Sequence, residues 1–267
     1  MRCAGSSLIY SRRPLHEALQ GVRRLGFSMV EVGTLEGWAH ISPVQARVDR
    51  EAVLAELQTA LSASGLSAIA FNAGLRGSPD DQGAQLNALA AIAHAVSART
   101  ITISVARGPS MSVEESERLR RFVAIAEEHG VHLAIETHMG TLAEDPTVAA
   151  AICRQIPGLG LTLDPSHYWA GPAQGKGWEV VLPYVQQVHL RDAGLGGGNA
   201  IQVAPGKGVV DFAAVVSGLA AVGVRPGFSV EYIDTLPVVG GGTVEEAARG
   251  MALLGERLLS PRDGREV

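Results

Sequence analysis

The chain alternates eight times between a short run of β-branched and apolar residues and a longer segment with helical spacing. Strands that alternate with helices in this way are typical of a parallel sheet with its helices outside. The alternation therefore predicts an α/β fold made of eight strand–helix units. The eight runs are Cys3–Tyr10, Ser28–Val32, Ser67–Asn72, Thr100–Val105, His132–Glu136, Gly160–Asp164, Gln187–Leu190 and Gly227–Tyr232.

The segments between the runs carry signals for helix starts and ends. Several begin with Pro, Asp or Ser and end with Gly, which are the residue types favoured at helix N-termini and C-termini. Ser112 is followed three residues later by Glu115, which is the spacing of a capping box. Helices are expected over residues 14–26, 49–65, 112–130, 211–223 and 243–259.

Eight such units in 267 residues favour closure into a single (β/α)8 TIM barrel, which typically takes about 250 residues. An open doubly wound sheet is the alternative, and it would usually carry a nucleotide-binding fingerprint after an early strand. The stretch "GLGGGN" has Asn199 where that fingerprint needs its last Gly, and "PGKGVV" lacks the rest of a P-loop. We therefore expect one domain over 1–267, with a frayed polar tail from about residue 260.

Composition and charge argue against nucleic acids and membranes as partners of this chain. The net charge of −5 and the lack of a large Lys/Arg cluster argue against nucleic acid. No apolar run is long enough to cross a membrane, and the N-terminus lacks the apolar core of a signal peptide. Cys3 and Cys153 form no disulfide framework and no zinc-finger spacing, so both are expected to be reduced thiols. A cytoplasmic protein that acts on a small molecule is the expectation.

Four polar side chains stand where the last four runs end. They are Glu136, Asp164, His189 and Glu231. In a barrel these strands are neighbours and their C-terminal ends share one part of the mouth. Three carboxylates in one place repel one another, and a divalent cation removes that repulsion. One strand-end Glu is more often a cap or an ion-pair partner, but the joint pattern predicts one ion of Mn²⁺, Mg²⁺, Co²⁺ or Zn²⁺.

Other polar and aromatic residues near strand ends have more than one role open to them. Glu31 and Asn72 end the second and third runs, and they either line the mouth or bond to backbone. Trp38, Trp169 and Tyr232 follow strand ends, where an aromatic ring can stack on a sugar or form an apolar lid or subunit contact. His40 and His138 are further candidates for the mouth.

The motifs at these positions resemble those of the sugar phosphate isomerase/epimerase superfamily, the xylose isomerase-like TIM barrels. The resemblance rests on "VEVG", "AIETH", "LTLDPSH", "VHLRDA", "QVAPGKGVVDF" and "FSVEY", and covers nearly the whole chain. It implies one divalent metal ion held by Glu136, Asp164, His189 and Glu231. It also implies that His167 and Arg191 face the substrate.

The superfamily contains several activities, so fold and metal site transfer better than reaction. Ketose epimerases, hydroxypyruvate isomerase-like enzymes, inosose dehydratases and dehydroshikimate dehydratases share it. Endonuclease IV shares the barrel too, but its trinuclear zinc site needs extra histidines after the third and fourth strands and in the loop after the seventh. The corresponding stretches "FNAGL", "SVARG" and "IQVAPGKG" contain none. The negative net charge also argues against a DNA substrate.

The expected function is a metal-dependent isomerase or epimerase of a sugar, polyol or keto acid, in carbohydrate metabolism. Glu136 and Glu231 are the expected acid–base pair for proton abstraction beside a carbonyl. His138, His167, Arg191, Trp38 and Trp169 are the expected substrate contacts.

Other interpretations stay open at this point. A dehydratase would use the same metal and base, a glycoside hydrolase would use Glu136 and Glu231 without a metal, and a non-catalytic barrel would bind a metabolite without turnover. The sequence does not identify the substrate or the metal. The apolar stretch "SHYWAGP" is a candidate contact for a homodimer.

Overall fold

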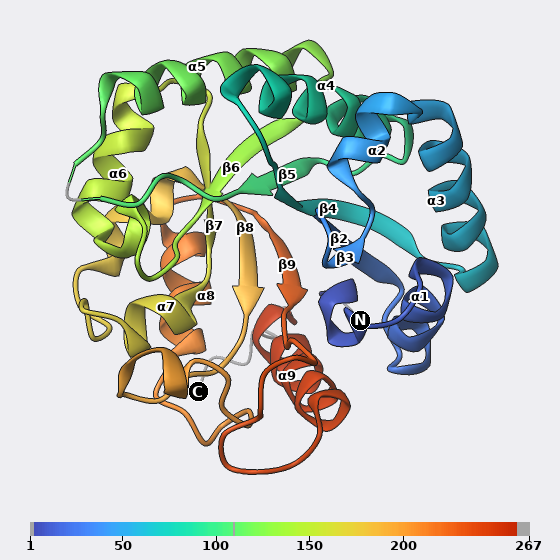
Figure 1. Cartoon of the computed structure of the whole chain (residues 1–267). Helices are drawn as coiled ribbons and strands as arrows, with labels where there is room; N and C mark the ends of the chain where they lie inside the picture. The colour runs from blue at the N-terminus through green and yellow to red at the C-terminus, as the bar shows by residue number, and fades with distance from the viewer. Residues whose placement is uncertain (1–2, 109, 261–267) are drawn as a thin grey trace.

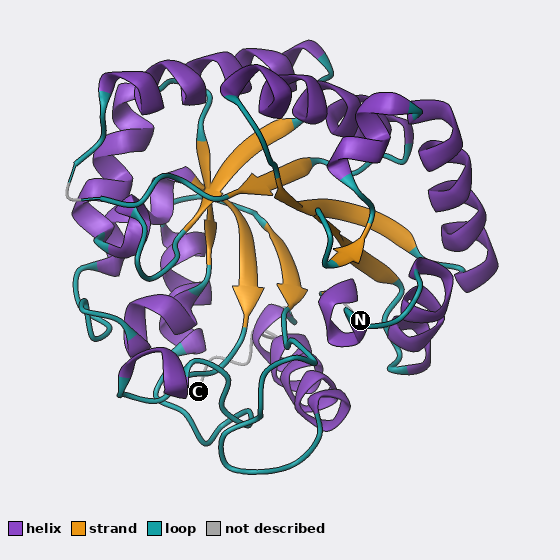
Figure 2. Cartoon of the chain, viewed as in Figure 1, coloured by secondary structure: helices purple, strands orange, loops and turns teal. Residues whose placement is uncertain are grey.

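Eight parallel strands close into a barrel in the computed structural model, which describes residues 3–108 and 110–260 (Figures 1 and 2). The strand order is β1-β9-β8-β7-β6-β5-β4-β2, and the pairing of β1 with β2 closes the ring. A short β3 pairs antiparallel with β2. The strands are β1 (Ala4–Ser6), β2 (Met29–Leu35), β3 (Ala39–His40), β4 (Ser67–Gly74), β5 (Thr100–Ile103), β6 (His132–Glu136), β7 (Gly160–Leu163), β8 (Val185–Leu190) and β9 (Gly227–Val230).

Helices surround the barrel, as the alternating sequence predicts (Figure 2). The predicted single (β/α)8 barrel is thus the observed fold. None of the described helices is long and apolar enough to cross a membrane. The α-helices are α1 (Leu15–Arg24), α2 (Pro43–Val48), α3 (Arg50–Ser64), α4 (Pro79–Ala95), α5 (Val113–Glu128), α6 (Pro146–Gln155), α7 (Pro165–Ala170), α8 (Phe212–Ala221) and α9 (Val244–Leu259). The 3₁₀ helices are η1 (Ser7–Tyr10), η2 (Leu142–Glu144), η3 (Trp178–Tyr184) and η4 (Gly197–Ala200).

The expected tail falls largely outside the described residues, which end at Ser260. Seven of the eight predicted strands begin and end within three residues of the observed strands. The first predicted strand, Cys3–Tyr10, was wrong over its second half, because β1 ends at Ser6 and η1 follows it. The Ser6 side chain accepts a hydrogen bond from the backbone N–H of Leu8, a local bond that competes with the strand. The turn carries the Tyr10 ring against α1, where Gly21 leaves room for it.

The predicted capping box at α5 forms only in one direction. Ser112 accepts a hydrogen bond from the backbone N–H of Glu115 at 3.1 Å, as expected. The Glu115 carboxylate instead accepts from the backbone N–H of Ala106 at 2.9 Å and pairs with Arg118. The side chain therefore ties the loop after β5 to α5 rather than bonding back to the helix start.

Polar side chains fill much of the barrel interior. The Thr102 and Thr162 hydroxyls lie 2.7 Å apart although β5 and β7 are not neighbours in the sheet, so this contact crosses the interior. Apolar residues such as Val30, Val32 and Ile101 alternate with the inward-facing ones and are fully buried. Because side chains alternate along a strand, the apolar set faces the helices and the polar set faces the barrel axis.

Burial raises the pKa of the Cys3 thiol to about 11 and that of Cys153 to about 12. Only the thiolate reacts with disulfide reagents, so both residues should react very slowly in the folded protein at pH 8. We expect Ellman's reagent to detect almost no thiol in the native state and two per chain in concentrated urea. Rapid labelling of either thiol in the folded protein would contradict this packing.

Candidate metal centre

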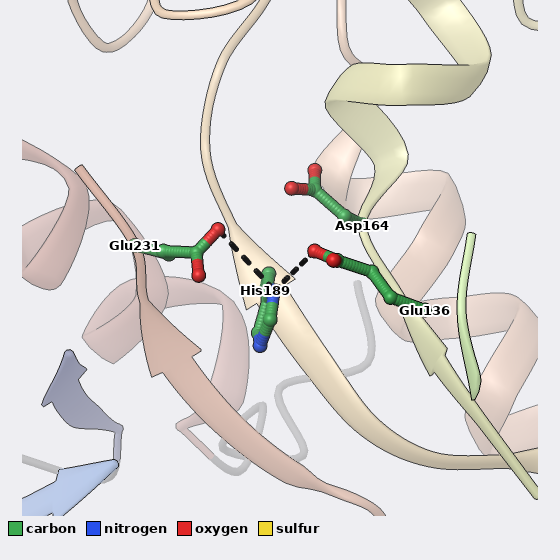
Figure 3. Close-up of side chains that lie close together, drawn as sticks. All are labelled: Glu136, Asp164, His189 and Glu231. Carbon is green, nitrogen blue, oxygen red and sulfur yellow. Dashed lines mark hydrogen bonds and ion pairs between the residues drawn. The ribbon is translucent and has the colours of Figure 1, made fainter. Parts of the chain in front are cut away.

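Glu136, Asp164, His189 and Glu231 come together at the C-terminal end of the barrel strands. Each offers one ligand atom, and these four atoms all lie within 4.8 Å of one another. All four residues are buried. Figure 3 shows His189 between the carboxylates of Glu136 and Glu231, with the Asp164 carboxylate on the same side as Glu136. The convergence expected from the strand ends is therefore present in the folded chain.

Local structure fixes each of the four side chains. Glu136 is the last residue of β6, His189 lies in β8, and Glu231 directly follows β9. Asp164 directly follows β7, and its backbone N–H donates to the Thr137 hydroxyl at 2.9 Å. One Asp164 oxygen also caps α7 by accepting the backbone N–H of Ser166 at 2.9 Å. The positions thus depend on strand ends and a helix start, which are the more rigid parts of a barrel mouth.

His189 has a carboxylate at each ring nitrogen. Its Nδ1 atom lies 3.1 Å from Glu136 Oε1 and 3.4 Å from Glu231 Oε2. Its Nε2 atom lies 3.1 Å from Glu31 Oε1. Burial opposes a charge on the imidazole, but the Glu231 and Glu31 carboxylates outweigh it and raise the pKa of His189 well above its usual value. The ring is held in one orientation, with Nδ1 towards the cluster.

Arg191 is the other buried cation at this centre. Its guanidinium pairs closely with Asp164 and lies 3.4 Å from Glu231. Burial raises the pKa of Asp164, and the neighbouring Glu231 charge adds to the rise, while Arg191 opposes it. Burial opposes ionisation of Glu231 too, but His189 and Arg191 prevail and lower the pKa of that carboxyl to about 2. The centre therefore combines Glu231, which ionises readily, with Asp164, whose ionisation is disfavoured by burial.

Negative charge exceeds positive charge in this buried region. Four carboxylates (Glu31, Glu136, Asp164 and Glu231) face two basic side chains, Arg191 and His189. Two negative charges stay unmatched when all six groups are ionised, which is costly in a region shielded from water. A bound divalent cation would offset most of this excess, since His189 must be neutral to act as a ligand and four carboxylates would then face the ion and Arg191 with one negative charge left over. Three carboxylates with one imidazole suit a hard or borderline ion. The residues present fit the metal expected from the sequence.

The predicted substrate contacts fall into two groups. His167 and Arg191 lie at the centre, because the guanidinium lies 3.1 Å from His167 Nε2. The His138 ring lies against His167 with a centroid distance of 3.9 Å. Burial, together with the Arg191 charge, lowers the pKa of His167 well below its usual value, so that ring is neutral at pH 7. These three side chains form a connected group beside Asp164.

The two predicted tryptophans lie elsewhere. Trp169 is 8% exposed and packs against Trp178, with 5.7 Å between ring centroids. Trp38 is 44% exposed and lines a pocket of about 420 Å³ with His40 and Arg12, to which none of the four cluster residues contributes. Tyr232 is fully buried, and its hydroxyl donates to the Val203 carbonyl at 2.8 Å. Of the three aromatic residues, only Trp38 presents a large surface to solvent.

Glu31 and Asn72, whose roles the sequence left open, both contact the cluster. Glu31 bonds to His189, and Asn72 Nδ2 donates to Glu231 Oε1 at 3.1 Å. Both contacts cross the barrel between strands that are not neighbours. A signal for Glu31 was available, since an acidic residue between Val30 and Val32 in a buried strand points to the interior.

A cavity also lies at the opposite end of the barrel. Its volume is about 970 Å³, and its lining includes the strand starts Met29, Ser67, Thr100, His132 and Gly227. No residue of the four-residue cluster lines it. Chemistry in such barrels sits at the C-terminal ends of the strands, so we take the buried cluster, not this cavity, as the candidate functional site.

Solved structures with the same fold are plentiful but distant in sequence. A xylose isomerase-like TIM barrel protein from Mycobacterium smegmatis in complex with magnesium matches with a TM-score of 0.76 and 17% identity, over 96% of each chain. A D-allulose 3-epimerase from Methylomonas sp. matches with a TM-score of 0.72 and 17% identity, over 96% of this chain and 98% of the other. A probable 3-DHS dehydratase, AsbF, from Bacillus anthracis matches with a TM-score of 0.72 and 14% identity, over 96% and 100%.

At these identities the structural matches establish the fold alone, and no curated protein sequence matches significantly. The family assignment rests on sequence, because the family model for xylose isomerase-like TIM barrels matches residues 19–256. That range contains the whole four-residue cluster and every strand except β1. The chain therefore belongs to the xylose isomerase-like TIM barrel family.

Proposed function

We propose that the protein is a divalent-metal-dependent isomerase or epimerase that removes a proton beside the carbonyl of a sugar, polyol or keto acid. The observation that carries the proposal is the buried cluster of three carboxylates and one imidazole, with more negative than positive charge around it. Glu136, Asp164, His189 and Glu231 would hold the ion. It would act as a Lewis acid that stabilises negative charge on the substrate oxygens.

Glu136 and Glu231 are the proposed acid–base pair. Their carboxylates approach His189 from two sides, so they can address two faces of one substrate (Figure 3). One carboxylate would take the proton from carbon, and the other would return a proton to the opposite face or to the adjacent carbon. The first outcome is epimerisation and the second is isomerisation.

His167 and Arg191 are the proposed contacts to substrate oxygens. The neutral His167 ring can donate or accept one hydrogen bond, and its low pKa keeps it neutral at pH 7. Arg191 offers several N–H donors, of which the contacts to Asp164 and Glu231 occupy one nitrogen. His138 would orient His167 through their ring contact. Trp38 and Trp169 lie outside this group, and their contact with substrate stays a prediction.

A dehydratase is the second candidate, because the same metal and base can expel a β-hydroxyl after proton removal. The structural likeness to a probable 3-DHS dehydratase favours keeping it. The two reactions differ in product, since dehydration releases water and forms a double bond.

We further propose a cytoplasmic protein with a small-molecule substrate. The homodimer stays a prediction that light scattering can test. Tyr168 and Trp169 of "SHYWAGP" are buried within the single chain, so they offer little surface to a second copy.

The first prediction of the proposed function is that each folded chain binds one divalent ion. Equilibrium dialysis against Mn²⁺ should give a stoichiometry of one, and Asp164→Asn should weaken binding because a neutral amide is a poorer ligand. Thr102→Val is the matched control, since Thr102 is a buried barrel residue that hydrogen-bonds to Thr162 and not to the cluster. Wild-type protein that is folded and binds no divalent ion would refute the metal centre. A chelator that leaves turnover intact would favour a glycoside hydrolase.

The second prediction concerns the base. In D₂O the wild-type enzyme should introduce solvent deuterium at the reacting carbon of its substrate, as mass spectrometry or NMR would detect. Glu136→Gln at saturating metal should slow this exchange by about 10²-fold or more, because a general base typically contributes 10²–10⁴-fold. Turnover without any solvent exchange would indicate a hydride shift and would remove Glu136 from this role.

A further inference from the structure

We propose that Glu31 is a positioning residue for His189, held in place by a chain of hydrogen bonds that runs down the barrel interior. The inference rests on the proposed metal centre but adds a residue outside the four-residue cluster. Glu31 lies in β2, His189 in β8, and the two strands are not neighbours in the sheet. Their contact of 3.1 Å therefore spans the interior of the barrel.

The geometry at His189 divides its two nitrogens between two tasks. Nδ1 faces Glu136 and Glu231, so it is the nitrogen available to a metal ion. Nε2 faces Glu31 Oε1, which can only accept a hydrogen bond when ionised. A proton on Nε2 satisfies Glu31 and leaves the Nδ1 lone pair free. Glu31 thus selects the tautomer and the ring orientation that metal binding requires.

A second oxygen of Glu31 is held just as firmly. Ser229 Oγ donates to Glu31 Oε2, and Gln187 Nε2 donates to Ser229 Oγ at 3.0 Å. Ser229 lies two residues before Glu231 in sequence, and Gln187 lies two residues before His189. Residues two apart in a strand share a face, so Ser229 and Gln187 also point into the barrel, each one layer below its cluster residue. Along this series of hydrogen bonds, Gln187 donates to Ser229 and Ser229 donates to the Glu31 carboxylate. Glu31, Ser229, Gln187 and His189 are all almost fully buried, so water does not compete.

The carboxylate at position 31 is needed for its negative charge and for its two acceptor oxygens. It meets two donors, the Nε2–H of His189 and the Ser229 hydroxyl, and each oxygen accepts one of them. An amide of the same size has one acceptor oxygen and an NH₂ group that only donates. Glu31→Gln can keep both contacts in only one orientation, in which its oxygen accepts from His189 and its NH₂ group donates to Ser229 Oγ, and a neutral amide oxygen accepts more weakly than a carboxylate. The reverse orientation places the NH₂ group against the Nε2–H of His189, although the volume is nearly unchanged.

Titration calorimetry with Mn²⁺ tests the proposal without any substrate. Glu31→Gln should bind Mn²⁺ about 10- to 100-fold more weakly than wild type, which is the usual effect of removing a group that orients a ligand. Ser229→Ala should weaken binding in the same direction but less, because it frees one oxygen of Glu31. Thr102→Val, a buried polar residue of the same barrel without contact to this chain, should bind within about twofold of wild type.

A spectroscopic measurement separates positioning from general loosening of the fold. In the Zn²⁺ complex with ¹⁵N-labelled histidine, the Nε2–H proton of His189 should appear downfield and exchange slowly, because it bonds to a buried carboxylate. In Glu31→Gln that resonance should move upfield or be lost, while circular dichroism stays unchanged. In Thr102→Val it should not move.

The outcomes distinguish this inference from the proposed function. Wild-type protein that binds Mn²⁺, together with a folded Glu31→Gln that binds it equally well, would overturn the role of Glu31 and leave the metal centre intact. Wild-type protein that binds no divalent ion would overturn both. If Glu31→Gln does not fold, Ser229→Ala decides, since binding equal to wild type refutes the chain and weaker binding supports it.

Discussion

The structure around the candidate site depends on the burial of four carboxylates inside one barrel. All four are almost completely buried: Glu31, Glu136, Asp164 and Glu231. An unmatched charge is costly in such a buried position, because water cannot solvate it. Two basic groups, Arg191 and His189, lie among them and match part of the charge. The arrangement suits a divalent cation, and it explains why the basic residues are buried as well.

Hydrogen bonds to the backbone make the mouth of the barrel rigid near these charges. Asp192 follows β8 and accepts backbone N–H groups from Ala193, Gly206 and Gly208. Gly208 has no room for a side chain, because a Cβ there would lie 2.0 Å from the Asp192 carboxylate. The loop after β8 is therefore wrapped around one buried acid, next in sequence to Arg191. A site held this way needs little reorganisation when a ligand binds.

Membership of the family does not determine the reaction, since structural relatives of similar likeness include an epimerase and a probable dehydratase. In this chain the exposed Trp38 and the pocket it lines follow the C-terminal end of β2, outside the four-residue cluster.

The sequence by itself determined the barrel and the strand ends that carry the four cluster residues. Its strand runs have the composition of buried β-structure, and parallel strands place their C-terminal ends together, so the convergence of Glu136, Asp164, His189 and Glu231 followed from order alone. The early end of β1 did not follow, because it depends on a Ser6 side-chain bond and on packing of Tyr10 against Gly21. The one-sided cap at Ser112 did not follow either, since the Glu115 carboxylate is drawn to Ala106 and Arg118.

Only the tertiary structure decided which side chains meet across the barrel. Glu31 lies 158 positions from His189, and Asn72 lies 159 positions from Glu231. Neither pair belongs to neighbouring strands, so no local pattern links them. Inward direction can be read from the alternation of a strand, but the partner across the axis depends on how the strands are staggered when the ring closes. That stagger is a property of the closed barrel, and it is what brings Glu31 to His189.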